Sequence, residues 1–344
     1  MIAAKKNLNP MKQKPRCEFA AYSLPQCINI STVKWGDAWV CDEHAGIRSQ
    51  SLVKQGFDIA LAFETRYYKL YSIDGFFPKI TSVRSYDDST LFCPAGMQRY
   101  TNCFKDPALA GTSKTTMSQQ ACLRVNDLDF LGDGSHLAYF NMLGLFSFGE
   151  LTMKQAIDFW LSFLYSIDPD KKIQRVTIHP EKFEEWRLLY PKELHDIVVP
   201  DSECVWSDGK EASGFCTEFY VDGIEVGNIV NTNGTMIDCG FGLERLEHVY
   251  QGKPMDTEVE ALQKACRAII ESGYAPGNKK QGYVLRKLLR RLHLKGGTLD
   301  HDYFYQELER QQEMVKTYER QKHKHLNKTP EWWLDTFGVD ITIL

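Results

Sequence analysis

The sequence lacks the long hydrophobic runs of membrane proteins. No stretch of about 18 consecutive apolar residues occurs among its 344 residues, which argues against a typical membrane-spanning helix. The segment 1–14 is basic, but no apolar core follows it, so it does not resemble a secretory signal peptide. We therefore predict a cytoplasmic protein with no membrane partner.

Dense cysteine spacing is also missing. The ten cysteines are scattered, whereas small disulfide-rich domains place them close together, so we expect reduced thiols. Cys41 and His44 lie three positions apart, but Cys17 and Cys27 do not form the second close pair that a structural zinc site usually has. We predict no metal site, and whether these four residues bind a metal stays open.

The chain has no large excess of charge of either sign, since its formal net charge is −4. The charge is nevertheless uneven, because the segment from Lys279 to Lys328 holds 13 Lys and Arg against 6 Asp and Glu. A basic segment on an acidic remainder is typical of a protein with a polyanionic partner. Charge alone, however, favours an ordinary solvated helical surface.

The hydrophobic pattern predicts both strands and helices. The predicted strands are 57–63, 120–124, 137–143, 226–230 and 236–238, and the predicted helices are 152–165, 245–250 and most of 256–321. Asn233 and Gly234 form a strong hairpin signal between the last two strands. Trp160 lies on the apolar side of its predicted helix and is expected in the core.

The run DCGFGLER at 238–245 is the most informative stretch of the chain. Gly240 and Gly242 let the backbone approach a flat ligand closely where a strand meets a helix. Arg245 begins that helix with a guanidinium that can stack on a base or bind a phosphate. Alone the pattern is weak, because Gly-x-Gly segments are commonly tight turns.

Three further segments make the pattern specific. They are LFCPAGMQ at 91–98, QACLR at 120–124 and NMLGLFSFG at 141–149. Together with the run 238–245, they resemble the catalytic domain of alanyl-tRNA synthetase, a class II aminoacyl-tRNA synthetase. The resemblance begins near Tyr67 and reaches the C-terminus.

The resemblance implies an α+β fold, with an antiparallel sheet flanked by helices and then a helical domain. It divides the chain into an unassigned region at 1–66, a catalytic domain at 67–254 and a helical, tRNA-binding-like domain at 255–344. No segment resembles the family's editing and oligomerisation domains, and the oligomeric state stays open.

The resemblance also implies a site for ATP with Mg²⁺. Arg124 matches the family arginine that bridges the amino-acid carboxylate and the α-phosphate of ATP. Phe140 matches the phenylalanine that stacks on adenine, and Arg245 would cover the other side of the base as a cation–π partner. Gly240 and Gly242 complete the predicted ATP site.

A small amino acid, alanine in the first place, would bind beside ATP. Trp206 matches a family tryptophan that forms a wall of the alanine site, and Asn228 and Val230 match a strand that lines it. Asp238 matches the acid that pairs with the α-ammonium group of the substrate. A tryptophan wall limits side-chain size, while a carboxylate fixes the amino end by a charge-assisted bond. Arg124 and Asp238 are therefore the predicted catalytic residues.

The helix at 283–291 resembles the tRNA-binding segment of the family, with Arg286, Arg290 and Arg291 as the predicted phosphate contacts. The loop after Arg124 departs from the family pattern. The Gly-Gly-Lys-His element of the family is missing there, and its lysine is missing with it. Ser135 and Asn141 replace an arginine and an acid of the family pattern.

These observations favour ATP-dependent activation of a small amino acid as its adenylate, with transfer to tRNA. The shortened loop and the missing domains leave two alternatives open. One is a ligase that passes the adenylate to a small molecule, a peptide or a carrier protein without tRNA. The other is a non-catalytic tRNA-binding paralogue. The sequence does not identify the final acceptor.

Overall fold

The computed structural model describes residues 33–35, 38–40, 58–71, 77–110, 114–134, 136–207, 213–232, 234–337, 339 and 341. Cys17, Cys27, Cys41 and His44 lie outside these residues, as does Ser135, so the question of a metal at the first four is not addressed by the structure. No described helix is long and apolar enough to cross a membrane.

The chain divides into two compact units, each built from several segments. The sheet unit comprises the described residues up to Lys79 together with Arg99–Gln119 and Met142–Pro254. The helical unit comprises Ile80–Gln98, Gln120–Asn141 and Met255–Leu344. Strands β4 and β5 each contribute residues to both units.

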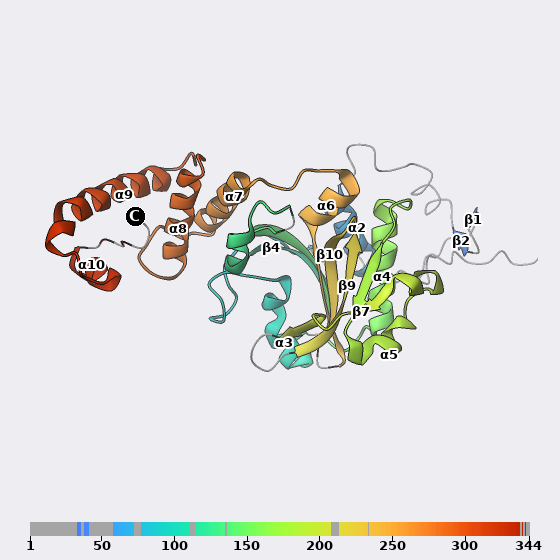
Figure 1. Ribbon diagram of the computed structural model, residues 1–344. Coiled ribbons are helices and arrows are strands. Elements are labelled where there is room, and N and C mark those ends of the chain that lie inside the picture. The colour runs from blue at the N-terminus through green and yellow to red at the C-terminus, as the bar shows by residue number, and fades with distance from the viewer. Residues whose placement is uncertain are drawn as a thin grey trace, which may run out of the picture. The chain divides into compact units, whose positions relative to one another are not determined.

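A nine-stranded sheet is the centre of the sheet unit (Figure 1). Its strands follow the order β3-β4-β5-β11-β10-β9-β6-β7, with β8 paired to β9. The strands are β3 (Lys79–Ile80), β4 (Thr115–Leu123), β5 (Tyr139–Ser147), β6 (Arg175–Ile178), β7 (Val198–Pro200), β8 (Val205–Ser207), β9 (Ser213–Val221), β10 (Ile224–Thr232) and β11 (Met236–Gly242). The pairs β5–β11, β11–β10, β10–β9, β9–β6 and β9–β8 are antiparallel, whereas β6 and β7 are parallel. The predicted α+β class is confirmed.

The helices of the sheet unit are α2 (Ile59–Tyr71), α3 (Thr101–Lys105), α4 (Met153–Ile167), α5 (Phe183–Arg187) and α6 (Leu243–Gln251). The prediction of a strand at 57–63 is wrong, because residues 59–63 of this apolar run form the beginning of α2. Ile59 and Phe63 are fully buried and lie four positions apart, which places them on one side of a helix. A short apolar run does not by itself distinguish the two structures.

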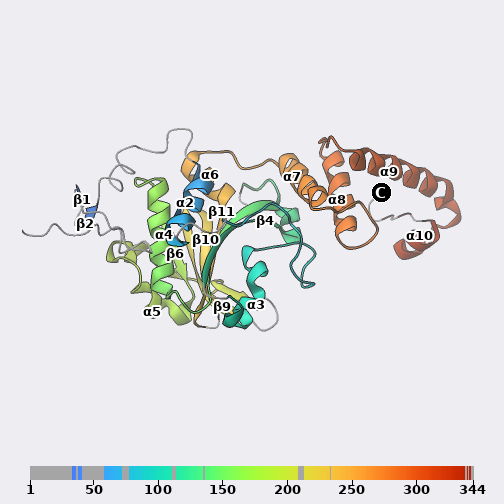
Figure 2. The ribbon, with the colours of Figure 1, turned by 180° about the vertical axis from the view of Figure 1, so that it is seen from behind.

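Helix α4 packs on one face of the sheet, in contact with β10 and β11, as Figures 1 and 2 show from opposite sides. Thr152 begins it with a capping box that includes Gln155, which satisfies backbone N–H groups of its first turn. Trp160 is fully buried and stacks on Phe241 of β11 with 3.6 Å between the ring centroids. The expected amphipathic helix and its core tryptophan are confirmed.

Alternation along β11 separates its two faces. Ile237, Cys239 and Phe241 are fully buried in the core that includes α4. Because successive side chains of a strand point to opposite faces, Asp238 and the glycines at 240 and 242 belong to the other face. The sheet thus has a core face under α4 and a second face, called the site face below.

The helical unit contains α7 (Glu258–Glu271), α8 (Lys280–Leu294), α9 (Asp302–Gln321) and α10 (Pro330–Phe337). These helices confirm the largely helical pattern predicted for 256–321. Helices α7 and α8 pack against each other through buried leucines and alanines, among them Leu262, Leu285 and Leu289. Thr257 begins α7 with a second capping box, completed by Glu260.

The core face can be tested with two leucines of the sheet unit. Leu145 of β5 is 1% exposed and lies opposite Cys239, whereas Leu188 is 73% exposed. We expect Leu145→Ala to lower the free energy of unfolding by about 2–5 kcal/mol, because it removes apolar contacts and leaves a cavity. Leu188→Ala, the matched control, should change it by less than about 0.5 kcal/mol. Equal effects in chemical denaturation would show that the core face is misassigned.

Candidate functional site

Paired strands place the predicted amino-acid residues in two rows on the site face. In the first row, Cys216 of β9, Val230 of β10, Asp238 of β11 and Phe146 of β5 stand side by side in register. In the next row, Glu218, Asn228, Gly240 and Gly144 do the same. Residues paired in register point to the same face, so Asn228, Val230 and Asp238 share one surface.

Asp238 is an acid among apolar neighbours. Its residue is 7% exposed, and its neighbours in register, Val230 and Phe146, are 2% and 0% exposed. Burial disfavours the charged carboxylate and raises the pKa of Asp238 to about 7. A carboxyl group whose pKa is near 7 ionises readily when a cation binds beside it.

Trp206 forms one border of this surface. It lies on the short strand β8 opposite Gly214 of β9 and packs, half-buried, against Val230, Cys204 and Cys216. A side chain at position 214 would collide with the backbone of Asn231 at 2.4 Å, so a glycine is needed there. The sheet unit therefore brings together Trp206, Asn228, Val230 and Asp238, the four residues predicted to bind the amino acid.

The two glycines of β11 have different surroundings. A Cβ atom at Gly240 would lie 2.8 Å from the Met142 sulfur, so the methionine already uses the space that a side chain would need. At Gly242 a Cβ atom would only reach ordinary contact distance, 3.6 Å from the side chain of Arg245. Gly242 thus leaves backbone accessible at the residue that precedes α6, which suits the approach of a flat ligand.

Arg245 is bound to a neighbouring acid of the sheet unit. Its Nη1 donates to the backbone oxygen of Glu225 at 2.9 Å and to the carboxylate of Glu225 at 3.0 Å. These bonds hold the guanidinium beside Gly242, and its side chain is 23% exposed. The structure therefore shows an anchored arginine next to the glycine, while its predicted role toward adenine stays a prediction.

Within the helical unit, Arg124 and Phe140 contact each other. The Arg124 guanidinium carbon lies 4.9 Å from the centroid of the Phe140 ring, and its Nε donates to the backbone oxygen of Pro94 at 3.0 Å. Pro94 belongs to the segment 91–98 that was singled out from the sequence. The hydrogen bond from Nε and the cation–π contact with Phe140 together fix the guanidinium group. Nη1 and Nη2 are then the donors that can bind an anion.

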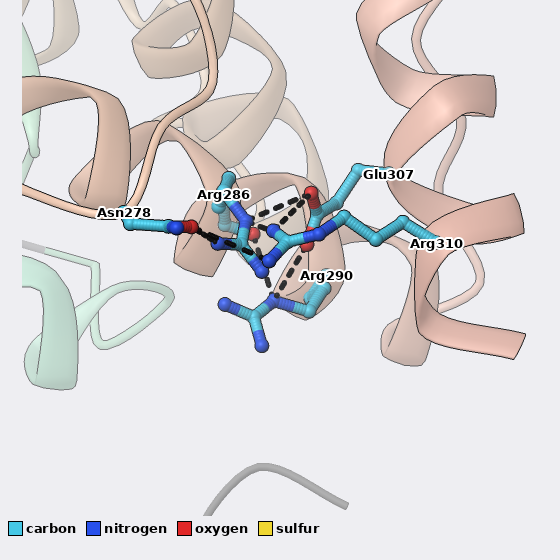
Figure 3. A network of polar contacts seen from close by, with 5 residues as sticks. All are labelled: Asn278, Arg286, Arg290, Glu307 and Arg310. Carbon is cyan, nitrogen blue, oxygen red and sulfur yellow. Dashed lines mark hydrogen bonds and ion pairs between the residues drawn. The ribbon is translucent and has the colours of Figure 1, made fainter. Parts of the chain in front are cut away.

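The arginines predicted to bind tRNA are engaged in ion pairs. Figure 3 shows Arg286 and Arg290 of α8 directed at Glu307 of α9, with Nε to carboxylate distances of 2.9 and 3.3 Å. Arg286 also donates to Asn278 at 2.5 Å, and both arginines are at most 5% exposed. Arg291 binds Glu258 of α7 at 2.6 Å. The three residues thus connect α8 to its neighbours, and direct contact with a polyanion stays a prediction.

A cavity of about 460 Å³ adjoins the Glu307 network in the helical unit. Arg286, Glu307 and Arg310 line it together with Asn278 and Tyr303. Arg310 is 37% exposed and lies 3.7 Å from Glu307, so it is the most accessible of the three arginines around this carboxylate. The sequence gave no indication of a role for Arg310, because this residue belongs to none of the motifs.

Three residues of the site face were missed in the sequence. Cys204, Cys216 and Glu218 place two thiols and a carboxylate close together beside Trp206. The alternate spacing of Cys216 and Glu218 along β9 was the only available signal, since Cys204 lies outside β9, just before β8.

A mainly antiparallel sheet, with helices behind it and an Asp-x-Gly-x-Gly strand that enters a helix, has the organisation of a class II synthetase catalytic unit. The family model of the class II (A) tRNA synthetases matches residues 75–251, just over half of the chain, and the chain belongs to this family.

Two curated relatives are alanine–tRNA ligases. The alanine–tRNA ligase of Chlamydia caviae is 31% identical over 280 residues, which cover 60% of this chain and 32% of that protein. The alanine–tRNA ligase of Francisella philomiragia is 30% identical over 289 residues, 62% of this chain and 33% of that protein. The chain thus spans about a third of the length of the curated relatives it matches. The resemblance to alanyl-tRNA synthetase is confirmed.

Among solved structures, the aspartyl tRNA synthetase from Entamoeba histolytica matches with a TM-score of 0.36 and 13% identity. The match covers 59% of this chain and 55% of that chain.

Burial of Asp238 makes stability depend on pH. The folded chain retains this proton up to about pH 7, whereas an unfolded aspartate loses it near pH 3.9. The associated stability is complete below about pH 4 and is lost as the pH rises through 7. Asp238→Asn stays neutral, so it should raise the unfolding midpoint relative to the parent at pH 8 and much less at pH 5. The exposed Asp170→Asn is the control for thermal unfolding. A difference that does not vary with pH would contradict the protonated state.

Proposed function

We propose that this chain activates alanine or a similarly small amino acid with ATP, forming the aminoacyl-adenylate, and transfers the aminoacyl group to tRNA in the cytoplasm. The observation that carries this proposal is the buried Asp238 on a surface bordered by Val230 and Trp206. A single acid in apolar surroundings fits the ammonium group of an amino acid whose side chain is small. The family membership and the alanine–tRNA ligase relatives support the same chemistry.

In the proposed first step, an oxygen of the amino-acid carboxylate attacks the α-phosphate of ATP, and pyrophosphate leaves. Negative charge gathers on the phosphate as this bond forms. The Nη groups of Arg124 would donate to the oxygens of the carboxylate and the α-phosphate, bringing them together and offsetting that charge. The Phe140 ring, which already packs on this guanidinium, would support the adenine base.

Asp238 would bind and orient the amino acid. Its carboxylate would accept hydrogen bonds from the α-ammonium group, and the new partner would restore the charged form that burial disfavours. Trp206 and Val230 would limit the volume for the side chain, and the Asn228 amide lies in the adjoining row as a further polar contact. Most of the specificity would then come from size.

For ATP, the residues present fit a nucleotide. Gly242 leaves accessible backbone, and Arg245 lies beside it, anchored on Glu225. Mg²⁺ usually binds through one or two carboxylates and the phosphates of the substrate. The Glu225 carboxylate beside Arg245 would supply an oxygen ligand of that kind, and the ion would neutralise charge on the phosphates.

A tRNA-independent ligase is the second candidate. Arg286 and Arg290 are buried against Glu307 and are not presented to solvent. This favours a structural role for the two arginines, in packing α8 on α9, over a role in binding tRNA. In that case the adenylate would pass to a small molecule, a peptide or a carrier protein. A chain that binds tRNA without activating an amino acid is a third outcome, consistent with the shortened loop after Arg124.

Activation can be measured as ATP–pyrophosphate exchange that depends on the amino acid. We expect exchange with alanine, and we expect Asp238→Ala to reduce its efficiency by more than about a hundredfold, because a charge-assisted contact in a dry site is lost. Asp170→Ala, which changes an exposed acid of the same unit, should leave exchange unchanged. If the folded parent shows no exchange with any amino acid, the chain is not an activating enzyme.

The titration of Asp238 should appear in the amino-acid dependence of exchange. Pairing with an ammonium group requires the carboxylate, and burial keeps the carboxyl protonated below about pH 7. The KM for the amino acid should therefore rise up to about tenfold per pH unit below 7, since each unit removes nine-tenths of the ionised form. The KM for ATP serves as the internal reference. A flat profile for the amino acid between pH 5.5 and 8 would mean that Asp238 does not bind it.

The acceptor can be tested through the salt dependence of binding. A tRNA held by cations should lose affinity steeply as salt rises. Lys287 is an exposed cation of α8, so Lys287→Ala should weaken binding and lower the salt slope by about one unit. Lys182→Ala in the sheet unit is the control. Undetectable or salt-independent binding by the parent would favour the tRNA-independent ligase.

A further inference from the structure

Two thiols and a carboxylate converge on the site face. The sulfurs of Cys204 and Cys216 and a carboxylate oxygen of Glu218 all lie within 4.8 Å of one another. Cys204 and Cys216 are 0% and 2% exposed, and Glu218 is half-buried. The proposed activation chemistry uses none of these three residues.

The strands fix this arrangement. Cys204 precedes β8 and lies opposite Cys216 of β9, whose backbone N–H donates to the Cys204 oxygen at 2.9 Å. Glu218 is two positions further along β9, so its side chain belongs to the same face as Cys216. Cross-strand hydrogen bonds thus hold the backbone positions that carry the three ligand side chains.

Neighbouring hydroxyls orient the carboxylate. The Cys204 thiol donates to the Thr177 hydroxyl at 2.9 Å, and that hydroxyl donates to Oε2 of Glu218 at 3.3 Å. The Tyr220 hydroxyl also donates to Oε2, at 2.8 Å. Both bonds fall on the same oxygen, which leaves Oε1 for another partner. Hydrogen bonds of this kind orient the ligands of many metal sites.

The donor set suits zinc. Zn²⁺ binds thiolates at about 2.3 Å and carboxylate oxygens at about 2.0–2.2 Å in tetrahedral geometry. Ligand atoms around it are then roughly 3.5–3.8 Å apart, so each separation between ligand atoms needs to shorten by at most about 1.3 Å for the cluster to close on an ion. Two thiols alone would also suit a disulfide, but that reading gives no part to the carboxylate, which is within reach of both sulfurs.

We propose that Cys204, Cys216 and Glu218 bind one zinc ion, with the fourth position open to water or another ligand. Trp206 and Val230 pack on the two cysteines, so the ion would lie behind the wall of the predicted amino-acid site and fasten β8 to β9. This inference does not depend on amino-acid activation.

Cobalt binding tests the proposal directly, because Co²⁺ replaces zinc and thiolate ligands give it intense absorption in the near ultraviolet. The full chain would carry Ser at positions 17, 27 and 41, so that the thiols outside the described residues give no signal. We expect one equivalent of Co²⁺ to bind with thiolate bands, and Zn²⁺ to displace it. Cys204→Ser and Cys216→Ser should abolish the bands, and Glu218→Gln should weaken binding at least tenfold.

Cys103→Ser, which removes a partly exposed thiol of the same unit, is the matched control and should bind as the parent does. If a cysteine variant fails to fold, Glu218→Gln, which keeps both thiols, decides the outcome. Absence of thiolate bands in the parent, bands that survive Cys204→Ser, or unchanged affinity in Glu218→Gln would each overturn the proposal. A Cys204–Cys216 disulfide that forms in place of metal binding would overturn it as well.

Discussion

The two-residue repeat of β11 is the constraint on which the sheet unit depends. Ile237, Cys239 and Phe241 lie in the core beneath α4, so the residues between them must take the opposite face. A shift of one position would bury the glycines under the helix and expose the aromatic ring. The stack of Phe241 on Trp160 holds this register, and through it the position of Asp238.

The same constraint explains why an acid is found where apolar neighbours disfavour its charge. Position 238 cannot turn toward solvent without moving the strand, and its cross-strand neighbours Val230 and Phe146 are buried. Burying the Asp238 carboxylate costs free energy, and the packing of the rest of the core offsets that cost. In the proposed function, a substrate cation that enters this surface would recover part of that cost, and destabilisation of the free chain would become selectivity for a positively charged group.

The fold, and the placement of Trp206, Asn228, Val230 and Asp238 on one surface, were largely predictable because their signals are local, whereas their binding of an amino acid stays a prediction. The Asn-Gly turn, the alternation of β11 and the periodicity of α4 each lie within one short segment, and resemblance to a family supplied the roles of Asp238 and Trp206. Pairings between distant segments were not predictable. Nothing near Arg286 indicates that Glu307, on the next helix, will bury it, and Cys204 meets Cys216 only once β8 pairs with β9. The strand predicted at 57–63 failed because a short apolar run fits both structures.

Strand β11 also has consequences for the order in which the chain folds. Strands β9, β10 and β11 follow one another as hairpins, so their contacts are local and close short loops. The pairing of β11 with β5 joins Asp238 to Phe146, 92 positions away, and encloses α4, β6 and the whole hairpin series. Closing so long a loop costs more chain entropy. We therefore expect the hairpins to form first and the row that contains the buried acid to be completed later, when β11 pairs with β5.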